Sequence, residues 1–598
     1  MTRPTKLELT WIGKENRPRL EPRILIEDPA KSYHAPFRAS ETDSFDNRLI
    51  FGDNLLALKA LEQEFAGKIK CIFIDPPFNT GEMFDHYDDG LEHSLWLTQM
   101  RDRLTALHRL LAGDGSFFVQ IDDNELGYLI AVMDEIFGRR NRIAVVTFKQ
   151  SSVSGPKAVN PGLVSTTSFV LYYAKDRAQW KPNRVFQPTE RDDRYNRYVA
   201  NVDEPFSVWR LEPLRKAFAD FHGIAVKEIR KQFADSLEST MMEFVLTDPR
   251  RVVRTARVAP KDINPDARAA LAQSDACHGR VFRSQRADRG DYYFLDGEQL
   301  VFYSAKAKHI DGKWVTALPA STMWDDLLSN NLHNEGGVDF PNGKKPEGLL
   351  KRILDLATDA GDWILDSFAG SGTTGAVAHK MGRRWIMVEL GEHCHTHIIP
   401  RLTRVINGAD DSGITGAVDW KGGGGFRYYR LAPSLLEKDQ FGNWVINRKY
   451  DAPMLAEAIC KLEGFVYAPS DTVYWQHGRS TEQDFIYITT QTLTREQIQR
   501  LSDEVGESRS LLVMCGAFRV KNLDEYPNLT VKKIPKAVLA RCEWGHDDYS
   551  LEIKNLPTRQ SEETEPTSDG ALRSKEERRA MAGQRSLFDP PTGKGGAK

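Results

Sequence analysis

The fold is decided by the stretch Trp363-Ile364-Leu365-Asp366-Ser367-Phe368-Ala369-Gly370-Ser371-Gly372-Thr373-Thr374-Gly375, which joins an apolar run to a glycine-rich loop. The apolar run predicts a buried strand, and the glycines predict a loop whose backbone can approach a ligand closely. The stretch Cys71-Ile72-Phe73-Ile74-Asp75-Pro76-Pro77-Phe78 has the same layout, with a buried strand followed by a loop. Because open α/β sheets bind ligands where their strands end, both loops are candidate binding sites.

The segments around these two loops alternate between strands and helices. Apolar runs predict strands at 48–51, 70–75, 117–121, 143–148 and 385–389. Stripes of leucine at helical spacing between residues 55 and 65, and between 97 and 111, predict amphipathic helices. This alternation predicts an α/β fold with a mainly parallel, doubly wound, Rossmann-like sheet.

Two regions interrupt that alternation and suggest further domains. From about 176 to 320 the chain is rich in Arg, Asp, Pro and isolated aromatic residues without a clean period, which predicts an inserted domain. Beyond a run of glycines at 422–425, two strand patterns flank a helix that Thr494 and Gln497 would cap, which predicts a small α/β domain. We therefore expect an N-terminal extension (1–45), the first half of the sheet domain (46–175), an insertion (176–320), the second half (321–430), a C-terminal α/β domain (431–557) and a disordered tail (558–598).

The bulk composition argues against several classes of protein. The 598-residue chain shows no apolar run long enough to span a membrane and no signal-peptide pattern, so we expect a cytoplasmic protein. Its six cysteines form no CxxC pair, which argues against a structural zinc site. The cluster His393-Cys394-His395-Thr396-His397 lacks a second ligand pair at zinc spacing, so we expect no metal site there. The net charge of −3 does not by itself indicate a nucleic-acid partner.

The glycine loop has two functional interpretations and one structural interpretation. Gly370, Gly372 and Gly375 match the G-x-G-x-x-G pattern of dinucleotide-binding loops, and Glu389 ends the next predicted strand. A carboxylate there can accept hydrogen bonds from both ribose hydroxyls of an adenosine, which NAD and S-adenosylmethionine (SAM) share. The pattern therefore leaves NAD and SAM open, and a purely structural glycine turn is the third alternative.

The loop Asp75-Pro76-Pro77-Phe78 suits one chemical task. Two consecutive prolines fix two φ angles and remove two donors, so the loop is rigid and presents its leading carboxylate and its carbonyl groups. Asp75 and the carbonyl of Pro76 could accept the hydrogens of an exocyclic amino group on a nucleobase and aim its lone pair at a methyl donor. Phe78 offers a stacking face for a base extruded from a duplex. A plain Asp-Pro-Pro turn is the structural alternative.

Together the two loops resemble the motifs of the beta-group amino-methyltransferases that act on DNA. The pattern D-x-F-x-G-x-G-T-T at 366–374 resembles the SAM motif of that family, and Lys345-Pro346, after Asp339-Phe340-Pro341, resembles its additional cofactor-side motif. The resemblance implies a methyltransferase fold with permuted motif order, in which the SAM-binding residues are Asp366, Phe368, Gly370, Gly372, Thr373, Glu389, Lys345 and Pro346. It also implies that the catalytic residues are Asp75, Pro76, Pro77 and Phe78, and that the insertion is a target-recognition domain.

Residue types also bear on which base is methylated. No cysteine follows a proline, so the thiolate that methylation of cytosine at C5 requires is not presented in its usual context. In the family that the chain resembles, Asp at the first catalytic position goes with adenine and Ser with cytosine. Asp75 therefore favours the N6 amino group of adenine, and methylation of cytosine at N4 is the alternative.

The insertion contains one run of positive charge with no acid inside it. Arg250, Arg251, Arg254 and Arg257 lie in this run, at 249–261, and are candidate contacts to the phosphates or guanine edges of double-stranded DNA. A solvated surface segment is the alternative interpretation.

The size of the chain, the segments 75–81 and 121–125 and the C-terminal domain most resemble the modification subunits of type III restriction-modification systems. That resemblance implies a homodimer and a separate helicase-nuclease restriction subunit, and the lack of a Walker A pattern agrees with it. In the tail, Gln584-Arg585-Ser586-Leu587-Phe588 resembles peptides that bind the bacterial sliding clamp. The alternatives are a solitary DNA methyltransferase, a methyltransferase of another phage-defence system and, more distantly, a nicotinamide-dependent oxidoreductase.

Overall fold

The structure is a computed structural model that describes residues 8–36, 38–41, 43–77, 89–151, 153, 163–287, 290–327, 332–340 and 343–549. Phe78, Pro341 and the segment 584–588 lie outside the described residues. None of the helices in the described ranges is long and apolar enough to cross a membrane.

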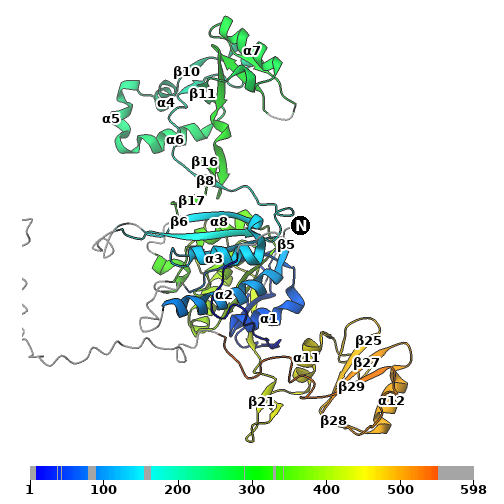
Figure 1. Ribbon diagram of the computed structural model, residues 1–598. Helices are drawn as coiled ribbons and strands as arrows, with labels where there is room; N and C mark the ends of the chain where they lie inside the picture. Colours follow the sequence, from blue (N-terminus) through cyan, green and yellow to red (C-terminus); the bar gives the residue numbers. More distant parts are fainter. Residues whose placement is uncertain are drawn as a thin grey trace, which may run out of the picture. The chain divides into compact units, whose positions relative to one another are not determined.

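A central sheet of eleven strands organises the chain, in the order β1-β20-β3-β19-β18-β4-β5-β7-β6-β17, with β2 beside β20 (Figure 1). Its strands are β1 Leu25–Glu27, β2 Tyr33–His34, β3 Asn47–Phe51, β4 Ile69–Ile74, β5 Leu111–Ile121, β6 Arg142–Lys149, β7 Thr167–Ala174, β17 Met323–Trp324, β18 Trp363–Asp366, β19 Arg384–Glu389 and β20 Gly425–Leu431. The expected strands are all present within one or two residues of their predicted ends, apart from β5, which begins six residues earlier at Leu111.

The middle of the sheet is parallel, as the alternation of strands and helices predicts. Strands β20, β3, β19, β18, β4 and β5 pair in parallel with one another in that order. Strand β7 is the exception, because it runs antiparallel between β5 and β6. The prediction of a mainly parallel, doubly wound sheet is therefore confirmed, with an antiparallel strand that the sequence patterns did not indicate.

Helices cover both faces of the central sheet. One face packs against α1 Asn54–Phe65, α2 Asp89–Leu110 and α3 Leu126–Met133, and the other against α8 Glu347–Ala357, α9 Thr373–Lys380 and α10 Ile399–Ile406. The side chains of strand β4 alternate between the two faces. Ile72 and Ile74 pack in the core on the α1–α3 face, and Cys71 and Phe73 pack in the core on the α8–α10 face. A strand with apolar residues at every position is buried on both faces, which explains the continuous apolar run before Asp75.

The N-terminal segment contributes to the same sheet. Strands β1 and β2 both pair antiparallel with β20, through Ile26 opposite Arg430 and Tyr33 opposite Phe426. The run Gly422-Gly423-Gly424 leads into β20, and all three residues have positive φ, a conformation that favours glycine. The glycine run therefore belongs to the sheet domain rather than to a linker.

Residues between β7 and β17 form small sheets and helices of their own. The six-stranded sheet contains β9 Arg197–Val199, β10 Leu211–Pro213, β11 Val252–Ala256, β12 Phe282–Ser284, β13 Tyr292–Leu295 and β14 Glu298–Phe302. The three-stranded sheet contains β8 Phe186–Pro188, β15 Ala307–Ile310 and β16 Lys313–Pro319. The helices are α4 Leu214–His222, α5 Ile229–Phe233, α6 Leu237–Thr247 and α7 Pro265–Ala276.

Residues after β20 form a further set of helices and small sheets. A hairpin of β21 Leu436–Lys438 and β22 Trp444–Ile446 precedes α11 Ala452–Glu463. The five-stranded sheet contains β23 Val466–Tyr467, β24 Gly478–Arg479, β25 Asp484–Ile488, β27 Ser510–Cys515 and β29 Leu529–Lys533, and β26 Thr492–Leu493 pairs with β28 Ala517–Phe518. Helix α12 Arg495–Val505 connects β25 to β27, and its predicted capping box of Thr494 and Gln497 is confirmed.

The capping box makes a prediction about local stability. Replacing Thr494 by Ala removes the hydroxyl that accepts the amide hydrogen of Gln497 at 3.3 Å, so α12 should open more easily by about 1 kcal/mol. Hydrogen exchange at the first amides of α12 measures this change. Thr494→Ser retains the hydroxyl and serves as the control; equal exchange in the Ala and Ser variants would contradict the assigned role.

Candidate active site at the carboxyl edge of the sheet

Three carboxylates from different parts of the chain meet at one edge of the central sheet. Asp75 follows β4, Asp366 ends β18 and Glu389 ends β19. These strands are parallel neighbours, so their carboxyl ends lie at the same edge. The two sequence motifs that are far apart in the chain therefore form one site, at the position where open α/β sheets bind ligands.

Asp75 forms an ion pair with Lys345. Its Oδ2 lies 2.7 Å from Nζ of Lys345, and its Oδ1 is buried with no hydrogen-bond partner among the described residues. Burial raises the pKa of Asp75, and the charge and hydrogen bond of Lys345 oppose that rise. A buried acceptor without a donor is costly, and such groups concentrate where a ligand or substrate completes the hydrogen bonding.

The proline loop after Asp75 is anchored by a tryptophan that the sequence motifs do not include. The indole Nε1 of Trp96, on α2, donates to the carbonyl oxygen of Pro77 at 3.0 Å. Trp96 is buried in the core beneath this loop. Its only sequence signal is the helical spacing of α2, which predicts a core residue and not its hydrogen bond. Because Trp96 already donates to the carbonyl oxygen of Pro77, the carbonyl of Pro76 is the candidate acceptor for a substrate amino group.

The glycine loop curls around the carboxylate of Glu389. Oε2 of Glu389 accepts from the amide of Gly370 at 2.8 Å, and Oε1 accepts from the amide of Gly391 at 2.9 Å. Gly370 and Gly372 have φ of +53° and +78°, so glycine is favoured at both positions. Gly372 directly precedes α9, whose first residue is Thr373. The loop therefore presents a helix N-terminus and a carboxylate side by side.

Asp366 lies under the loop and has an unusual proton affinity. It accepts from the hydroxyl of Thr374 at 2.5 Å and from the amide of Phe368 at 2.9 Å. Burial, together with the nearby negative charges of Asp75 and Glu389, raises the pKa of Asp366 to about 7. Carboxylates brought this close repel one another, so the site as a whole favours a positively charged ligand.

The remaining predicted cofactor residues surround this loop. Phe368 is half-buried against the core on the α1 side, and Pro346 directly precedes α8. Lys345 is buried, and its carbonyl oxygen accepts from the hydroxyl of Thr373 at 3.4 Å. The segment before α8 thus touches both the glycine loop and Asp75, the latter through the Lys345 side chain.

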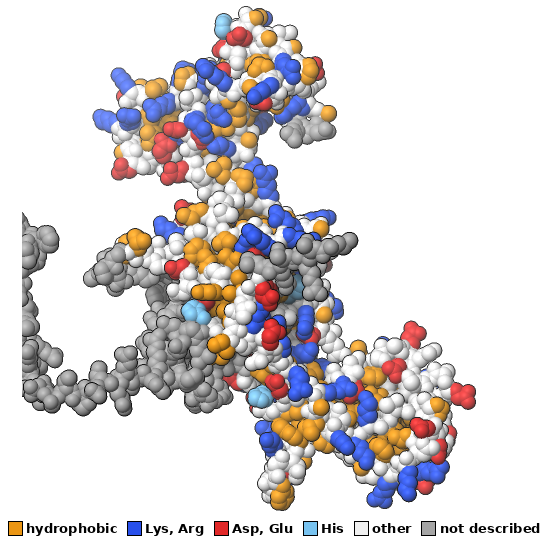
Figure 2. Space-filling view, viewed as in Figure 1, with side chains coloured by type: hydrophobic (Ala, Val, Ile, Leu, Met, Phe, Trp, Pro, Cys, Tyr) orange, Lys and Arg blue, Asp and Glu red, His pale blue; other side chains and the backbone are white. Residues whose placement is uncertain are grey.

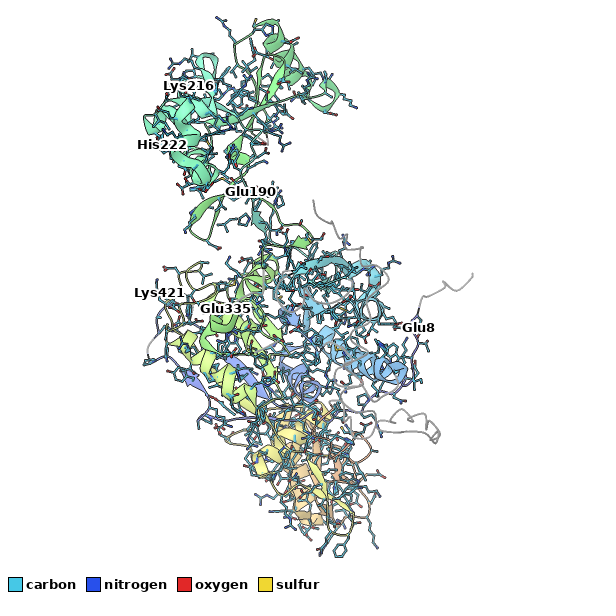
Figure 3. All side chains as sticks on the ribbon, turned by 90° about the vertical axis from the view of Figure 1, so that its left-hand side faces the viewer. Glu8, Glu190, Lys216, His222, Glu335 and Lys421 are labelled. Atoms are coloured by element: carbon cyan, nitrogen blue, oxygen red, sulfur yellow. The ribbon has the colours of Figure 1, made fainter. Side chains whose placement is uncertain are left out.

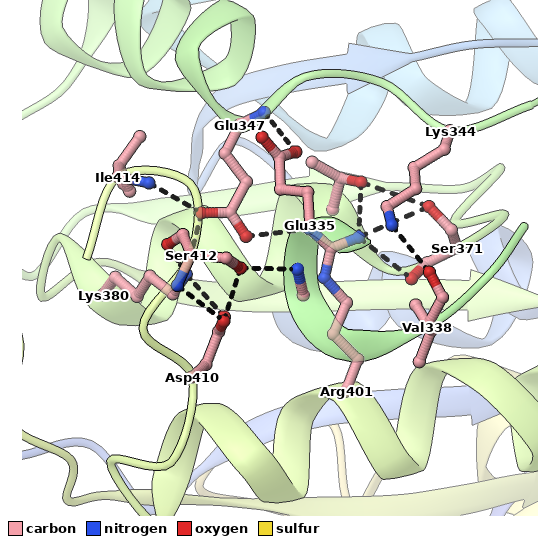
Figure 4. A network of polar contacts seen from close by, with 12 residues as sticks. Glu335, Val338, Lys344, Glu347, Ser371, Lys380, Arg401, Asp410, Ser412 and Ile414 are labelled. Atoms are coloured by element: carbon pink, nitrogen blue, oxygen red, sulfur yellow. Dashed lines mark hydrogen bonds and ion pairs between the residues drawn. The ribbon is translucent and has the colours of Figure 1, made fainter. Parts of the chain in front are cut away.

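A fully buried ionic network supports the glycine loop (Figure 4). Arg401 on α10 donates to the hydroxyl of Thr373 at 2.7 Å and pairs with Glu347 at 2.8 Å. Glu347 also pairs with Lys380 at 2.8 Å, and Lys380 pairs with Asp410 at 2.7 Å. Sequence reasoning missed this network, because single charged residues on amphipathic helices normally predict exposed positions.

The arginines of the basic run are mostly engaged with acids of the insertion. Arg250 and Arg251 pair with Asp248 and Asp203, at distances from 2.6 to 3.4 Å. Arg254 lies over the ring of Tyr195 at 5.5 Å. The side chain of Arg257 is 95% exposed, with its Nε 3.6 Å from Glu298.

Lysines and arginines are spread over the visible face of the insertion, among hydrophobic and acidic side chains (Figure 2). Lys216 on α4 (Figure 3), for example, pairs with Glu212 and Asp220 at 2.6 and 3.2 Å. Of the four predicted arginines, Arg257 presents its charge most openly to solvent.

The histidine cluster packs beside the glycine loop. His393 lies 3.0 Å from Glu389, and the ring of Phe340 meets that of His393 at a tilt and that of His397 edge-on, with ring centroids 5.3 and 5.4 Å away. His397 contacts the backbone carbonyl of Asp339 at 3.1 Å. Among the described residues no group of three or more His, Cys, Asp or Glu side chains is arranged to hold a metal ion.

The charge of the site discriminates between the two cofactors that the glycine pattern left open. Asp75, Asp366 and Glu389 converge, with Lys345 as the partner of Asp75. Such a site suits the sulfonium cation of SAM, whereas the pyrophosphate of NAD would add negative charge beside three carboxylates. Glu389 also presents its carboxylate where an adenosine ribose could donate to it.

A family model described as DNA methylase matches residues 69–399, more than half of the chain, and the protein belongs to this family. The chain is 34% identical over 420 residues to the "Probable type III restriction-modification enzyme HindVI Mod subunit" of Haemophilus influenzae, covering 66% of this chain and 55% of that protein. It is 25% identical over 516 residues to the EcoP15I Mod subunit of Escherichia coli, covering 72% of each chain. Among solved structures, the M1.HpyAVI–SAM complex is similar at 13% identity and a TM-score of 0.28, covering 59% of this chain and 98% of that one.

The buried network makes a prediction about cofactor binding. Arg401→Met removes the charge-assisted hydrogen bond to Thr373, so we expect the Kd for SAM to rise by about tenfold. Isothermal titration calorimetry measures this change.

Asp410→Asn provides a matched control for Arg401→Met, because Asp410 belongs to the same buried network but contacts Lys380 and Ser412 rather than the loop. We expect this variant to lower the Tm without weakening SAM binding. If both variants weaken SAM binding equally, general destabilisation explains the effect and the assigned role of Arg401 is wrong.

Proposed function

We propose that the protein transfers the methyl group of SAM to the N6 amino group of adenine in DNA, as the modification subunit of a type III restriction-modification system. The observation that carries the proposal is the buried Oδ1 of Asp75, which lacks a partner among the described residues and lies with Asp366 and the glycine loop at one edge of the sheet. Membership of the DNA methylase family and similarity to two Mod subunits support it.

The residues of the site have distinct tasks in this reaction. SAM supplies a methyl group on a positively charged sulfur, from which a nucleophile can take it. The amino group of adenine is a poor nucleophile, because its lone pair is delocalised into the ring. By accepting one amino hydrogen on Oδ1, Asp75 favours a tetrahedral nitrogen, and the carbonyl of Pro76 can accept the second. As the N–C bond forms, the bond between the methyl carbon and sulfur breaks, and sulfur keeps its electron pair as a neutral thioether. The nitrogen loses one proton, which the adjacent Asp75 carboxylate can accept and pass to solvent.

The cofactor would be held by the loop and by the ends of β18 and β19. Glu389 can bind the ribose hydroxyls, and Asp366 complements the positively charged end of the molecule. The positive φ of Gly370 and Gly372 allows the backbone to approach the ligand closely. Lys345 and Pro346 stay predicted cofactor-side residues through the family resemblance.

The insertion is the proposed reader of double-stranded DNA, with Arg250, Arg251, Arg254 and Arg257 as candidate contacts. The target adenine must leave the DNA double helix to reach this site, and an aromatic ring can then stabilise the extruded base by stacking. The resemblance assigns that face to Phe78. Phosphate contacts by Arg257 and its neighbours would make binding strongly salt-dependent.

The proposed partners follow from the relatives rather than from any surface of this chain. The names of the similar proteins identify them as Mod subunits of type III enzymes, so a separate restriction subunit is the expected partner. A homodimer and a contact between residues 584–588 and a sliding clamp remain predictions from the sequence. A solitary DNA methyltransferase is the alternative that shares the same site.

The chemistry is tested at Asp75. Incubating the protein with SAM and unmethylated bacterial DNA, followed by single-molecule sequencing, should reveal N6-methyladenine in one short sequence motif. In Asp75→Asn the rate of methylation should fall by about 10²-fold to 10³-fold, because the charge that polarises the amino group is lost. Calorimetry should show that this variant still binds SAM. Modified cytosine in place of adenine would refute the assignment of the base, and unmodified DNA would refute the proposal.

The cofactor is tested separately by titration. The protein should bind SAM, with no measurable binding of NAD under the same conditions, because a pyrophosphate would face Asp75, Asp366 and Glu389. Adenosine, which SAM and NAD share, serves as a competitor that controls for recognition of the nucleoside alone. Tight binding of NAD without SAM binding would favour the oxidoreductase alternative.

A further inference from the structure

We propose that Lys345 is a positioning residue for Asp75, which holds one carboxylate oxygen and thereby leaves the other free and ionised for the amino group of the target base. The inference rests on the proposed function, and it differs from the role in cofactor binding that the family resemblance assigns to Lys345. It concerns the state of Asp75 before and during base binding.

The geometry divides the two oxygens of Asp75 between two tasks. Nζ of Lys345 lies 2.7 Å from Oδ2, the distance of a charge-assisted hydrogen bond. Oδ1 is buried and without a partner among the described residues. A carboxylate fixed at one oxygen cannot rotate freely, so the direction in which Oδ1 accepts a hydrogen is also set.

Lys345 is itself held in place by its surroundings. Its side chain is only 11% exposed, and its backbone carbonyl accepts from the hydroxyl of Thr373 in the glycine loop at 3.4 Å. The next residue, Pro346, precedes α8, whose first residue Glu347 belongs to the buried network with Arg401. The position of the ammonium group is therefore coupled to the structure of the cofactor loop.

The charges around Asp75 explain why an ammonium group is needed there. The negative charges of Asp75 and Glu389 both act on Asp366 and help to raise its pKa, so carboxylates crowd this edge of the sheet. Burial also favours the protonated form of Asp75, and Lys345 is the group that opposes it. A protonated Asp75 would bring a donor to the amino group of adenine, where an acceptor is required.

The neighbouring lysine provides a matched control. Lys344 is also buried, but its Nζ donates to the carbonyl oxygen of Val338 at 2.6 Å (Figure 4). The two lysines are adjacent in sequence and equal in charge. Of these two lysines, Lys345 forms the ion pair with the carboxylate of Asp75. Loss of a buried positive charge in this segment can therefore be separated from loss of the Asp75 contact.

The test is the pH dependence of single-turnover methylation, with saturating SAM and DNA, in wild type and in Lys345→Met, Lys345→Arg and Lys344→Met. Activity needs ionised Asp75, so it is lost as the pH falls through the pKa of this group. Removing the ammonium group raises that pKa. The acidic limb of the pH–rate profile, where activity falls with pH, should therefore move to higher pH by about one unit or more in Lys345→Met. Lys345→Arg should restore the wild-type limb, and Lys344→Met should leave it unmoved.

Two results would overturn the inference. One is an unmoved acidic limb in Lys345→Met with a higher Kd for SAM, which would return Lys345 to a role in cofactor binding. The other is an equal displacement of the limb in Lys344→Met, which would indicate a general effect of charge.

A double-mutant cycle on thermal unfolding makes the test independent of activity. If Lys345 holds the Asp75 carboxylate, Asp75→Asn should lower the Tm of the wild type more than it lowers the Tm of Lys345→Met. Additive changes in Tm would overturn the contact. If the wild type methylates no DNA, the proposed function fails while the cycle still tests the ion pair, so the two failures are distinguishable.

Discussion

The structure depends on concentrating negative charge at one edge of a sheet while keeping that charge out of water. Asp75, Asp366 and Glu389 end up together because β4, β18 and β19 are parallel neighbours. Each carboxylate is stabilised differently, by an ammonium group, by a hydroxyl and an amide, and by two backbone amides. The stabilisation is incomplete, as the pKa of about 7 for Asp366 indicates. A cationic cofactor would complete this stabilisation. The crowding of the three carboxylates therefore accounts both for the raised pKa of Asp366 and for the preference for a positively charged cofactor.

A second layer of buried charge lies behind the glycine loop. Arg401, Glu347, Lys380 and Asp410 alternate in sign, and each of them contacts at least one oppositely charged neighbour. Buried ion pairs add little net stability, because desolvation offsets much of the Coulomb attraction, but breaking one member is costly. Such a network therefore suits a loop that must keep one conformation. It connects α8, α9 and α10 to the hydroxyl of Thr373, and so to the place where the cofactor is expected.

Sequence patterns predicted the parts of this site whose signals are local. The apolar runs before Asp75 and Asp366 and the glycines at 370 and 372 each depend on neighbours within a few residues, as does the capping box at Thr494 outside the site. Trp96, Arg401 and β7 gave no such signal. A tryptophan or arginine in an amphipathic helix predicts packing or exposure, whereas its hydrogen bond to Pro77 or Thr373 depends on residues far away in the chain.

By itself the sequence determined the class of fold, the two loops and the residue types that make them chemically useful. The tertiary structure alone decided which side chains meet: that Lys345 contacts Asp75, that Glu389 binds the amides of Gly370 and Gly391, and that β1 and β2 extend the sheet beside β20. The physical reason is the range of the interactions. The periodicity of helices and strands, and the caps of helices, depend on residues that are close together in the sequence. Strand order and buried ion pairs arise only when distant segments pack into one low-dielectric core.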